Sequence, residues 1–335
     1  MKALVLNAAD GPKSAKIEQR DIPLPAAGEV RVAVKAASLN HRELFISRGM
    51  YPGMSLPAIL GADGAGVIEA VGEGVDAARI GEEVVLYPAA DWGDDERFPS
   101  SKFGLLGMPH PGTLAEYICV SAGSAVAKPE CLTFGEAACL PVAALTAWRA
   151  LTVKANVAKG ETVLVTGIGG GVAVWALKFA NALGATVYVT SGSDEKIAQA
   201  VALGAAGGIN YREEKWGKAL AKLTGGIDVV IDGAPGGGIG QYVRSLNMGA
   251  RAVIYGSTGK PDFNVMAPEL FLRHASIIGT AMGTVDDFRE MLIFVQENKL
   301  KPVIEKIFTL DDAGEALSYL EGNHQMGKVV VNISE

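Results

Sequence analysis

Short alternations of polar and apolar residues fill the first 122 positions of the chain. Residues 29–34 read EVRVAV, in which every second side chain is apolar, as in a strand that buries one face. Residues 66–71 and 82–87 have a similar character, and glycine-rich turns separate these segments. The helical-looking stretch in this part is short and covers residues 41–48. The pattern predicts a compact β-rich domain.

A different pattern extends from about residue 123 to about residue 292. Continuous apolar runs, typical of strands buried on both faces, alternate there with helical segments. The predicted strands are residues 162–166, 186–190, 228–231 and 252–255, and the predicted helices are residues 172–183 and 194–203. This β-α-β-α-β order predicts an α/β fold with a doubly wound parallel sheet. The chain ends in another apolar run, residues 327–333, which could return to pair with the first domain.

Composition narrows the class of protein and its partners. The formal net charge is −7 and no Lys/Arg run occurs, so a nucleic-acid partner is not expected. The three cysteines are odd in number and widely spaced, which argues against a disulfide framework and favours a reducing cytoplasm. No signal-peptide pattern and no uncharged apolar stretch of about 18 residues is present. We expect a cytoplasmic protein that acts on a small molecule and has no membrane partner.

The most specific local motif is a glycine-rich turn at residues 166–173, TGIGGGVA, between a predicted strand and a predicted helix. Glycines allow the tight turn and let the backbone approach a pyrophosphate, which the N-terminus of the following helix attracts. The predicted cofactor contacts here are Gly167, Gly169, Gly170, Gly171 and Val172. The alternative is a glycine-rich turn without a ligand. The strand before it and the helix after it favour dinucleotide binding.

The end of the second predicted strand bears on the choice of nicotinamide cofactor. Sites for NAD usually place Asp or Glu there to bind the ribose 2′-hydroxyl, but this strand ends in TSGS. Ser191 and Ser193 can hydrogen-bond a 2′-phosphate, and Lys196 can supply positive charge. Ser193 could equally be a helix N-cap, and Lys196 could be a solvated helix residue. The sequence favours NADPH over NADH.

Several motifs in order give the chain its resemblance to the medium-chain dehydrogenase/reductase superfamily, close to the quinone oxidoreductase branch. They are the glycine turn, LGADGAG at 60–66, GTLAEY at 112–117, LTAWRAL at 145–151 and GKVV at 327–330. The resemblance implies a GroES-like catalytic domain, formed by residues 1–122 and 293–335. It also implies a Rossmann cofactor domain, residues 123–292, and a homodimer.

Many members of that superfamily are zinc alcohol dehydrogenases, and this sequence departs from their pattern. The positions that match their catalytic ligands carry an amide and two aliphatic side chains, Asn40, Ala62 and Val142. Residues 88–112, which match the structural zinc lobe, contain no cysteine. A different site built from His41, Glu43 and Asp63 lacks metal-type spacing. The resemblance therefore implies an enzyme without zinc.

Without a Lewis acid, exchange between alcohol and aldehyde is difficult, whereas an activated alkene or quinone spreads the developing charge over its conjugated system. The resemblance implies that the catalytic candidates Asn40 and Tyr51 line the mouth of the substrate site. Either could donate to the substrate oxygen, and Tyr51 or a water could supply the proton. Asn40 could instead be the N-cap of the stretch at 41–48, and Tyr51 a loop aromatic.

Further cofactor contacts follow from the same resemblance and from the rule that doubly wound sheets bind ligands at the carboxyl ends of their strands. These candidates are His41, Thr146, Tyr211, Gly256, Ser257, Thr258, Thr280, Ala281 and Lys328. The resulting expectation is an NADPH-dependent quinone or enone oxidoreductase. The alternatives are a zinc-type alcohol dehydrogenase and a protein that binds NADPH without turnover.

Overall fold

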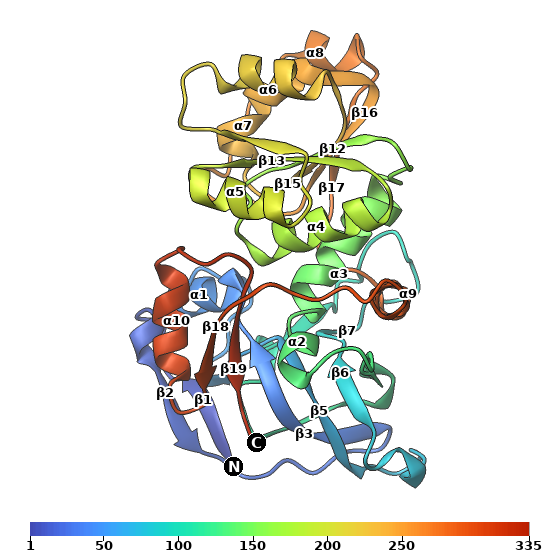
Figure 1. Cartoon of the computed structure of the whole chain (residues 1–335). Helices are drawn as coiled ribbons and strands as arrows, with labels where there is room; N and C mark the ends of the chain where they lie inside the picture. Colours follow the sequence, from blue (N-terminus) through green and yellow to red (C-terminus); the bar gives the residue numbers. More distant parts are fainter. Residues whose placement is uncertain (335) are drawn as a thin grey trace. The chain divides into compact units, whose positions relative to one another are not determined.

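The protein's structure is a computed structural model that describes residues 1–334, and the chain divides into two compact units (Figure 1). Unit 1 comprises Met1–Val142 and Thr284–Glu335, and unit 2 comprises Ala143–Gly283. The boundaries differ from those expected, because residues 123–142 and 284–292 lie in unit 1 and not with the Rossmann domain. These segments pack on the β-rich core; for example, the rings of Phe288 and Tyr87 lie 5.8 Å apart.

Unit 1 is built mainly of strands. Its strands are β1 (Lys2–Leu6), β2 (Ala15–Gln19), β3 (Glu29–Ser38), β4 (Ala58–Ile59), β5 (Asp63–Val71), β6 (Glu83–Leu86), β7 (Ala89–Ala90), β8 (Gly104–Leu106), β9 (Pro109–His110), β10 (Tyr117–Ser121), β11 (Ala125–Ala127), β18 (Ile304–Thr309) and β19 (Lys328–Asn332). Its helices are α1 (His41–Ser47), α2 (Phe134–Ala137), α9 (Val285–Glu297) and α10 (Ala313–Glu321). Short 3-10 turns lie at Pro12–Ser14, Ala77–Arg79 and Ala122–Ser124.

Strand β3 is the centre of the main sheet of unit 1, whose order is β11-β6-β5-β3-β19-β18 with β10 also paired to β3. The predicted alternation holds, because Val30, Val32 and Val34 are fully buried in the core while the residues between them are half-buried. Strand β19 pairs antiparallel with β3, which confirms that the last apolar run returns to the first part of the chain. The register sets Asp63 and Val330 on either side of Ser38.

Unit 2 contains one six-stranded parallel sheet in the order β14-β13-β12-β15-β16-β17. Its strands are β12 (Thr162–Val165), β13 (Thr186–Ser191), β14 (Gly207–Asn210), β15 (Ile227–Asp232), β16 (Leu246–Ile254) and β17 (Ser276–Gly279). Its helices are α4 (Gly171–Ala182), α5 (Asp194–Ala202), α6 (Trp216–Thr224), α7 (Pro235–Tyr242) and α8 (Ala267–Phe271), with a 3-10 turn at Val243–Ser245. Helix α3 (Pro141–Arg149) and the π-helical turn Ala150–Lys154 precede β12.

Helices cover both faces of this sheet, with α4 and α5 on one side and α6 and α7 on the other (Figure 1). Val163, Leu164 and Val165 are therefore all fully buried, which explains the continuous apolar runs in the sequence. The strand order is that of a dinucleotide-binding Rossmann sheet, so the predicted doubly wound α/β class is confirmed.

Two further expectations concern the chain as a whole. Cys119, Cys131 and Cys139, all within the described residues, form no disulfide. Across residues 1–334, none of the helices has the length and hydropathy needed to cross a bilayer.

Candidate functional site

The glycine turn of unit 2 joins β12 to α4, as the sequence predicts. Gly167 and Gly169 have φ values of 63° and 133°, which side chains with a Cβ rarely adopt. Gly170 is the N-cap of α4 and makes no side-chain cap, and a Cβ built on it would meet no atom within 4 Å. The N–H groups of the first helical turn, those of Gly171 and Val172 among them, have no acceptor within the helix, as at the start of every α-helix. This arrangement fits a phosphate group.

A buried carboxylate, Asp232, anchors the residue that precedes the glycine turn. Thr166, the residue before the turn, donates its hydroxyl to Asp232 Oδ1 at 2.6 Å. The Tyr242 hydroxyl donates to Oδ2 at 2.7 Å, and the Ala234 N–H donates to Oδ1 at 2.8 Å. Asp232 is completely buried at the carboxyl end of β15. Burial, followed by the Asp232 charge, raises the pKa of Tyr242 well above its ordinary value, so this phenol remains a donor.

The serines predicted to contact a 2′-phosphate lie where β13 meets α5. Ser193 is the N-cap of α5, and its Oγ accepts the Lys196 N–H at 3.3 Å. Ser191 is buried, and its Oγ accepts the Ser193 N–H at 3.2 Å. Asp194, the nearest acid, is the first residue of the helix and accepts a hydrogen bond from Asn210. No carboxylate therefore ends β13.

Tyr211 and its neighbour Arg212 reach this same strand end. A Cβ built on Gly192 would lie 2.8 Å from the Tyr211 hydroxyl and 2.9 Å from Arg212 Nε. Both side chains are exposed. The sequence singled out Tyr211 but missed Arg212, although the next position in INYR was the available signal. An arginine at this place is a known way to accommodate a 2′-phosphate.

The other cofactor candidates of unit 2 follow the ends of β16 and β17 or lie in α3. Thr258 N–H donates to the Gly233 carbonyl at 2.8 Å, which ties the segment Gly256, Ser257, Thr258 to the end of β15. Thr280 N–H donates to the Ile254 carbonyl, and Ala281 after it is exposed. Thr280 Oγ1 is buried and has no hydrogen-bond partner among residues 1–334, so it can serve a ligand. Thr146 is buried in α3, with Oγ1 3.9 Å from Met282 Sδ.

Unit 1 brings Asn40 together with two residues from distant parts of the chain. Lys328 Nζ donates to Asn40 Oδ1 at 2.6 Å and to Asp63 Oδ2 at 2.9 Å. Asn40 Nδ2 donates to the same Asp63 oxygen at 2.9 Å. Lys328 is 3% exposed and Asp63 0%, whereas Asn40 is half-buried. The amide is therefore the part of this network that a ligand can reach.

The surroundings of Lys328 differ from those expected of a residue that approaches cofactor phosphates. Its third hydrogen bond goes to the Leu39 carbonyl at 2.7 Å, so all three ammonium donors are used inside unit 1. Asp63 in turn accepts from Ser38 Oγ and from the Val142 N–H. As described, the lysine has no donor left for a phosphate. Its cofactor contact stays a prediction that this geometry does not favour.

Helix α1 links Asn40 to Tyr51. Asn40 is the N-cap of α1, and its N–H donates to Glu43 Oε2 at 2.7 Å. Burial raises the pKa of the Glu43 carboxyl, although the Arg42 guanidinium 3.0 Å away opposes the shift. Arg42 lies over the Tyr51 ring, 4.9 Å from its centre, and donates to the carbonyls at 106 and 108. His41 is the half-buried first residue of α1.

The donor chemistry around Asn40 does not fit zinc. Ala62 and Val142, the two aliphatic residues that the resemblance matches to zinc ligands, offer no metal-binding side chain. The carboxylates of the alternative set are engaged, Glu43 by Arg42 and Asp63 by Lys328. Within the described chain, no three His, Cys, Asp or Glu residues gather as a metal site would require. An ammonium hydrogen-bonded to Asn40 would also repel a divalent cation.

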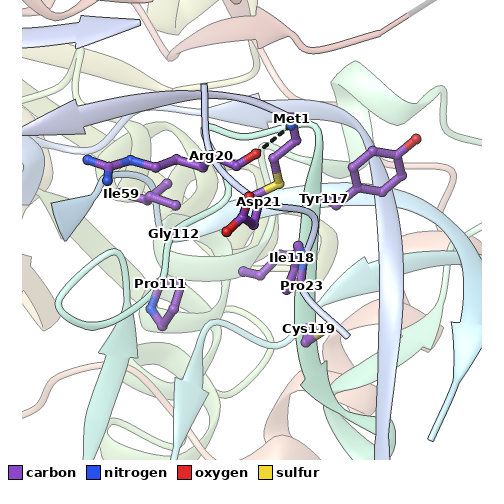
Figure 2. A pocket seen from close by; sticks show the side chains of 10 residues that line it. All are labelled: Met1, Arg20, Asp21, Pro23, Ile59, Pro111, Gly112, Tyr117, Ile118 and Cys119. Carbon is purple, nitrogen blue, oxygen red and sulfur yellow. Dashed lines mark hydrogen bonds between the residues drawn. The ribbon is translucent and has the colours of Figure 1, made fainter. Parts of the chain in front are cut away.

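A pocket of about 230 Å³ in unit 1 shares no residue with this network (Figure 2). It is lined by Met1, Arg20, Asp21, Pro23, Ile59, Pro111, Gly112, Tyr117, Ile118 and Cys119. The terminal ammonium donates to the Arg20 carbonyl across it. Burial, and then the charge of Glu29, raises the pKa of the Cys119 thiol to about 11. The thiol is therefore protonated at neutral pH, and the pocket offers no activated nucleophile.

Two protein-family models match the chain, one within unit 1 and one that begins in unit 2 and extends through α9 of unit 1. The alcohol dehydrogenase GroES-like domain matches residues 26–130, and the domain described as zinc-binding dehydrogenase matches residues 171–297. The first match confirms that the β-rich unit is GroES-like. The second covers most of the Rossmann sheet.

Individual relatives are similar over almost the whole chain. The zinc-type alcohol dehydrogenase-like protein YogA of Leptosphaeria maculans is 37% identical over 93% of this chain and 92% of its own. The acryloyl-coenzyme A reductase of Sulfurisphaera tokodaii is 31% identical over 99% of both chains. Human quinone oxidoreductase is 30% identical over 99% of this chain and 97% of its own. A crystal structure of an NAD-dependent alcohol dehydrogenase superposes with a TM-score of 0.94 at 36% identity, covering 100% of both chains.

Proposed function

The chain belongs to the medium-chain dehydrogenase/reductase family, and from this premise we propose that it reduces a quinone or an α,β-unsaturated carbonyl with NADPH and without zinc. The observation that carries the proposal is the amide of Asn40, which Lys328 and Asp63 hold by hydrogen bonds. The resemblance matches this position to a metal ligand of zinc enzymes. Two relatives, named as a quinone oxidoreductase and an acryloyl-coenzyme A reductase, support the substrate class.

The overall reaction consumes one NADPH, one proton and one enone, and gives NADP⁺ and the saturated carbonyl compound. When bound, NADPH supplies the hydride that adds to the β-carbon of the substrate. The pair of the C=C bond shifts to the bond between the α-carbon and the carbonyl carbon, and the C=O pair moves to the oxygen. When the α-carbon takes up a proton, the C=O bond forms again. The protein must therefore stabilise negative charge on one oxygen and provide one proton.

Asn40 is suited to the first task. One N–H of its amide is held by Asp63, and the other has no acceptor among residues 1–334. That free N–H can donate to a carbonyl oxygen as negative charge develops there. Tyr51 is suited to the second task, because its hydroxyl can hand a proton to the α-carbon. The Arg42 guanidinium stacked on its ring orders that side chain.

The preference for NADPH rests on the end of β13. Ser191 and Ser193 flank Gly192 in the chain, and Arg212 Nε lies next to the Gly192 backbone. Lys196 follows in the first turn of α5, and no carboxylate ends β13. A 2′-phosphate carries negative charge that such a set stabilises. The similar crystal structure of an NAD-dependent enzyme makes NADH the alternative to be tested.

A purified-protein assay tests both parts of the proposal. The oxidation of NADPH and of NADH is followed with benzoquinone, a simple enone, acryloyl-coenzyme A and a saturated aldehyde, and the metal content of the same sample is measured. We expect NADPH to be consumed with a quinone or an enone, with little aldehyde reduction, without zinc in stoichiometric amount and without inhibition by a chelator.

The same assay distinguishes this proposal from the two alternative functions. Stoichiometric zinc with aldehyde reduction would establish a zinc-type alcohol dehydrogenase, and NADPH binding without turnover on any acceptor would establish a non-catalytic protein. Replacing Lys196 with Ala should narrow the preference for NADPH over NADH about tenfold, because one charge-assisted hydrogen bond is removed. Lys222→Ala, an exposed lysine of α6, is the matched control and should leave that preference unchanged.

A further inference from the structure

Lys328 is positioned to act on the substrate through Asn40. Its ammonium group can donate hydrogen bonds and cannot accept them, so the atom of Asn40 that faces it must be the amide oxygen. The amide nitrogen is then the atom that contacts Asp63. The ion pair of Lys328 and Asp63 thus fixes which end of the amide is offered to a ligand.

The same contact changes the strength of the amide as a donor. A positive charge 2.6 Å from the amide oxygen withdraws electron density from the amide and makes its N–H groups more acidic. The effect is large only where water does not screen the charge, and Lys328 and Asp63 are almost completely buried. The half-buried Asn40 carries the effect to the surface of the network.

We propose that Lys328 is a positioning residue that polarises the Asn40 amide and thereby stabilises negative charge on the carbonyl oxygen of the substrate. This inference rests on the proposed function, since it requires a substrate that develops such charge. The positive charge of Lys328 acts on the substrate through the Asn40 amide. It thereby replaces part of the electrostatic stabilisation that a metal ion provides in zinc enzymes. It is neither a proton donor nor a ligand of the cofactor phosphates.

The test removes the charge without leaving a buried carboxylate unpaired. Lys328→Met alone would leave Asp63 as an unpaired buried charge and would destabilise the fold. The informative variant is therefore the double substitution Asp63→Asn with Lys328→Met. It is made in the unmodified protein and in an Asn40→Ala background, and kcat, KM and the NADPH dissociation constant are measured for each. Lys128→Met is the matched control, because the Lys128 side chain is only 7% exposed, donates to backbone carbonyls and pairs with Glu83, but does not contact Asn40.

We expect the double substitution to lower kcat about five- to tenfold when Asn40 is present, the difference between a charge-assisted and a neutral hydrogen bond. In the Asn40→Ala background the same substitution should change kcat less than about twofold, since the amide that carries the effect is gone. The NADPH dissociation constant should be unaffected, and Lys128→Met should leave kcat unchanged.

Two results would overturn the inference. An equal loss of kcat in both backgrounds would mean that Lys328 and Asp63 act only through the general integrity of unit 1. Weaker NADPH binding with an unchanged kcat would mean that Lys328 contacts the cofactor. Failure of the proposed function looks different, because the unmodified protein would then reduce neither quinones nor enones.

Discussion

Asp63 in unit 1 and Asp232 in unit 2 are both completely buried carboxylates, yet their environments differ. Asp63 is paired with the Lys328 ammonium and accepts further hydrogen bonds from an amide, a hydroxyl and a backbone N–H. The partners found for Asp232 are two hydroxyls and one backbone N–H, with no cation among them.

The different partners of Asp63 and Asp232 match the different groups that these two carboxylates hold in place. Asp232 organises the turn that would receive phosphate groups, where hydroxyl donors suffice to fix Thr166 and the backbone that follows it. Asp63 fixes an amide beside a positive charge, where the cation itself can contribute to the reaction. A buried charge that has only neutral donors loses one hydrogen bond at a time, whereas a buried ion pair that loses one partner leaves a whole charge uncompensated.

The largest effect is expected at the ion pair. Lys328→Met should lower the free energy of unfolding by about 3–5 kcal/mol, because Asp63 is left buried without its counter-charge. Urea denaturation measures the loss. Adding Asp63→Asn should recover most of it, and a double variant no more stable than Lys328→Met would show that packing, not charge, dominates at this site.

An intermediate effect is expected at Asp232. Thr166→Val removes one of its hydroxyl donors at nearly constant volume, and should cost about 1–3 kcal/mol of unfolding free energy. NADPH binding, measured by titration, should weaken as well, because Thr166 precedes the glycine turn. Thr152→Val is the control, since that hydroxyl donates to a carbonyl of its own helical segment. A loss as large as that of Lys328→Met would remove the contrast between the two carboxylates.

The smallest effect is expected at an ion pair that water reaches. Arg251 donates two hydrogen bonds to Glu161, at 2.7 and 2.9 Å, and these hold the pKa of the Glu161 carboxyl below its ordinary value. The contribution is present above the unfolded-state pKa and is lost as the pH falls through the folded-state pKa. Glu161→Gln should therefore cost less than about 1 kcal/mol at neutral pH. Denaturation at neutral and acid pH should show this difference shrinking in acid; a constant difference would contradict the assignment.

The local elements of unit 2 could be predicted in detail. The sequence placed the turn at 166–173 between a strand and a helix, and β12, α4, β13 and α5 begin and end within a residue or so of the expected positions. These elements could be predicted because glycine turns, the N-cap at Ser193 and continuous apolar runs depend only on neighbouring residues. Arg212 was missed although it follows Tyr211 directly, because its closeness to Gly192 depends on the return of the chain along β14.

In unit 1 the sequence indicated Asn40 and Tyr51 as candidates but not the groups that orient them. The stacking of Arg42 on Tyr51 and the pairing of Lys328 with Asp63 depend on side-chain directions, which periodicity does not give. The expected phosphate contact of Lys328 came from its family position and stays a prediction; in the structure its three hydrogen bonds go to acceptors of its own unit.

Residues close together in the chain were enough to predict the two folding patterns and the glycine turn, and the residue types at single family positions were enough to show that zinc-ligand side chains are missing there. Which cation pairs with which carboxylate depends on the folded chain. Lys328 and Asp63 are 265 positions apart, and they meet because β5 and β19 both pair with β3 in a fixed register around Ser38. Strand register is set by the packing of the whole sheet, so no local pattern could have specified that contact.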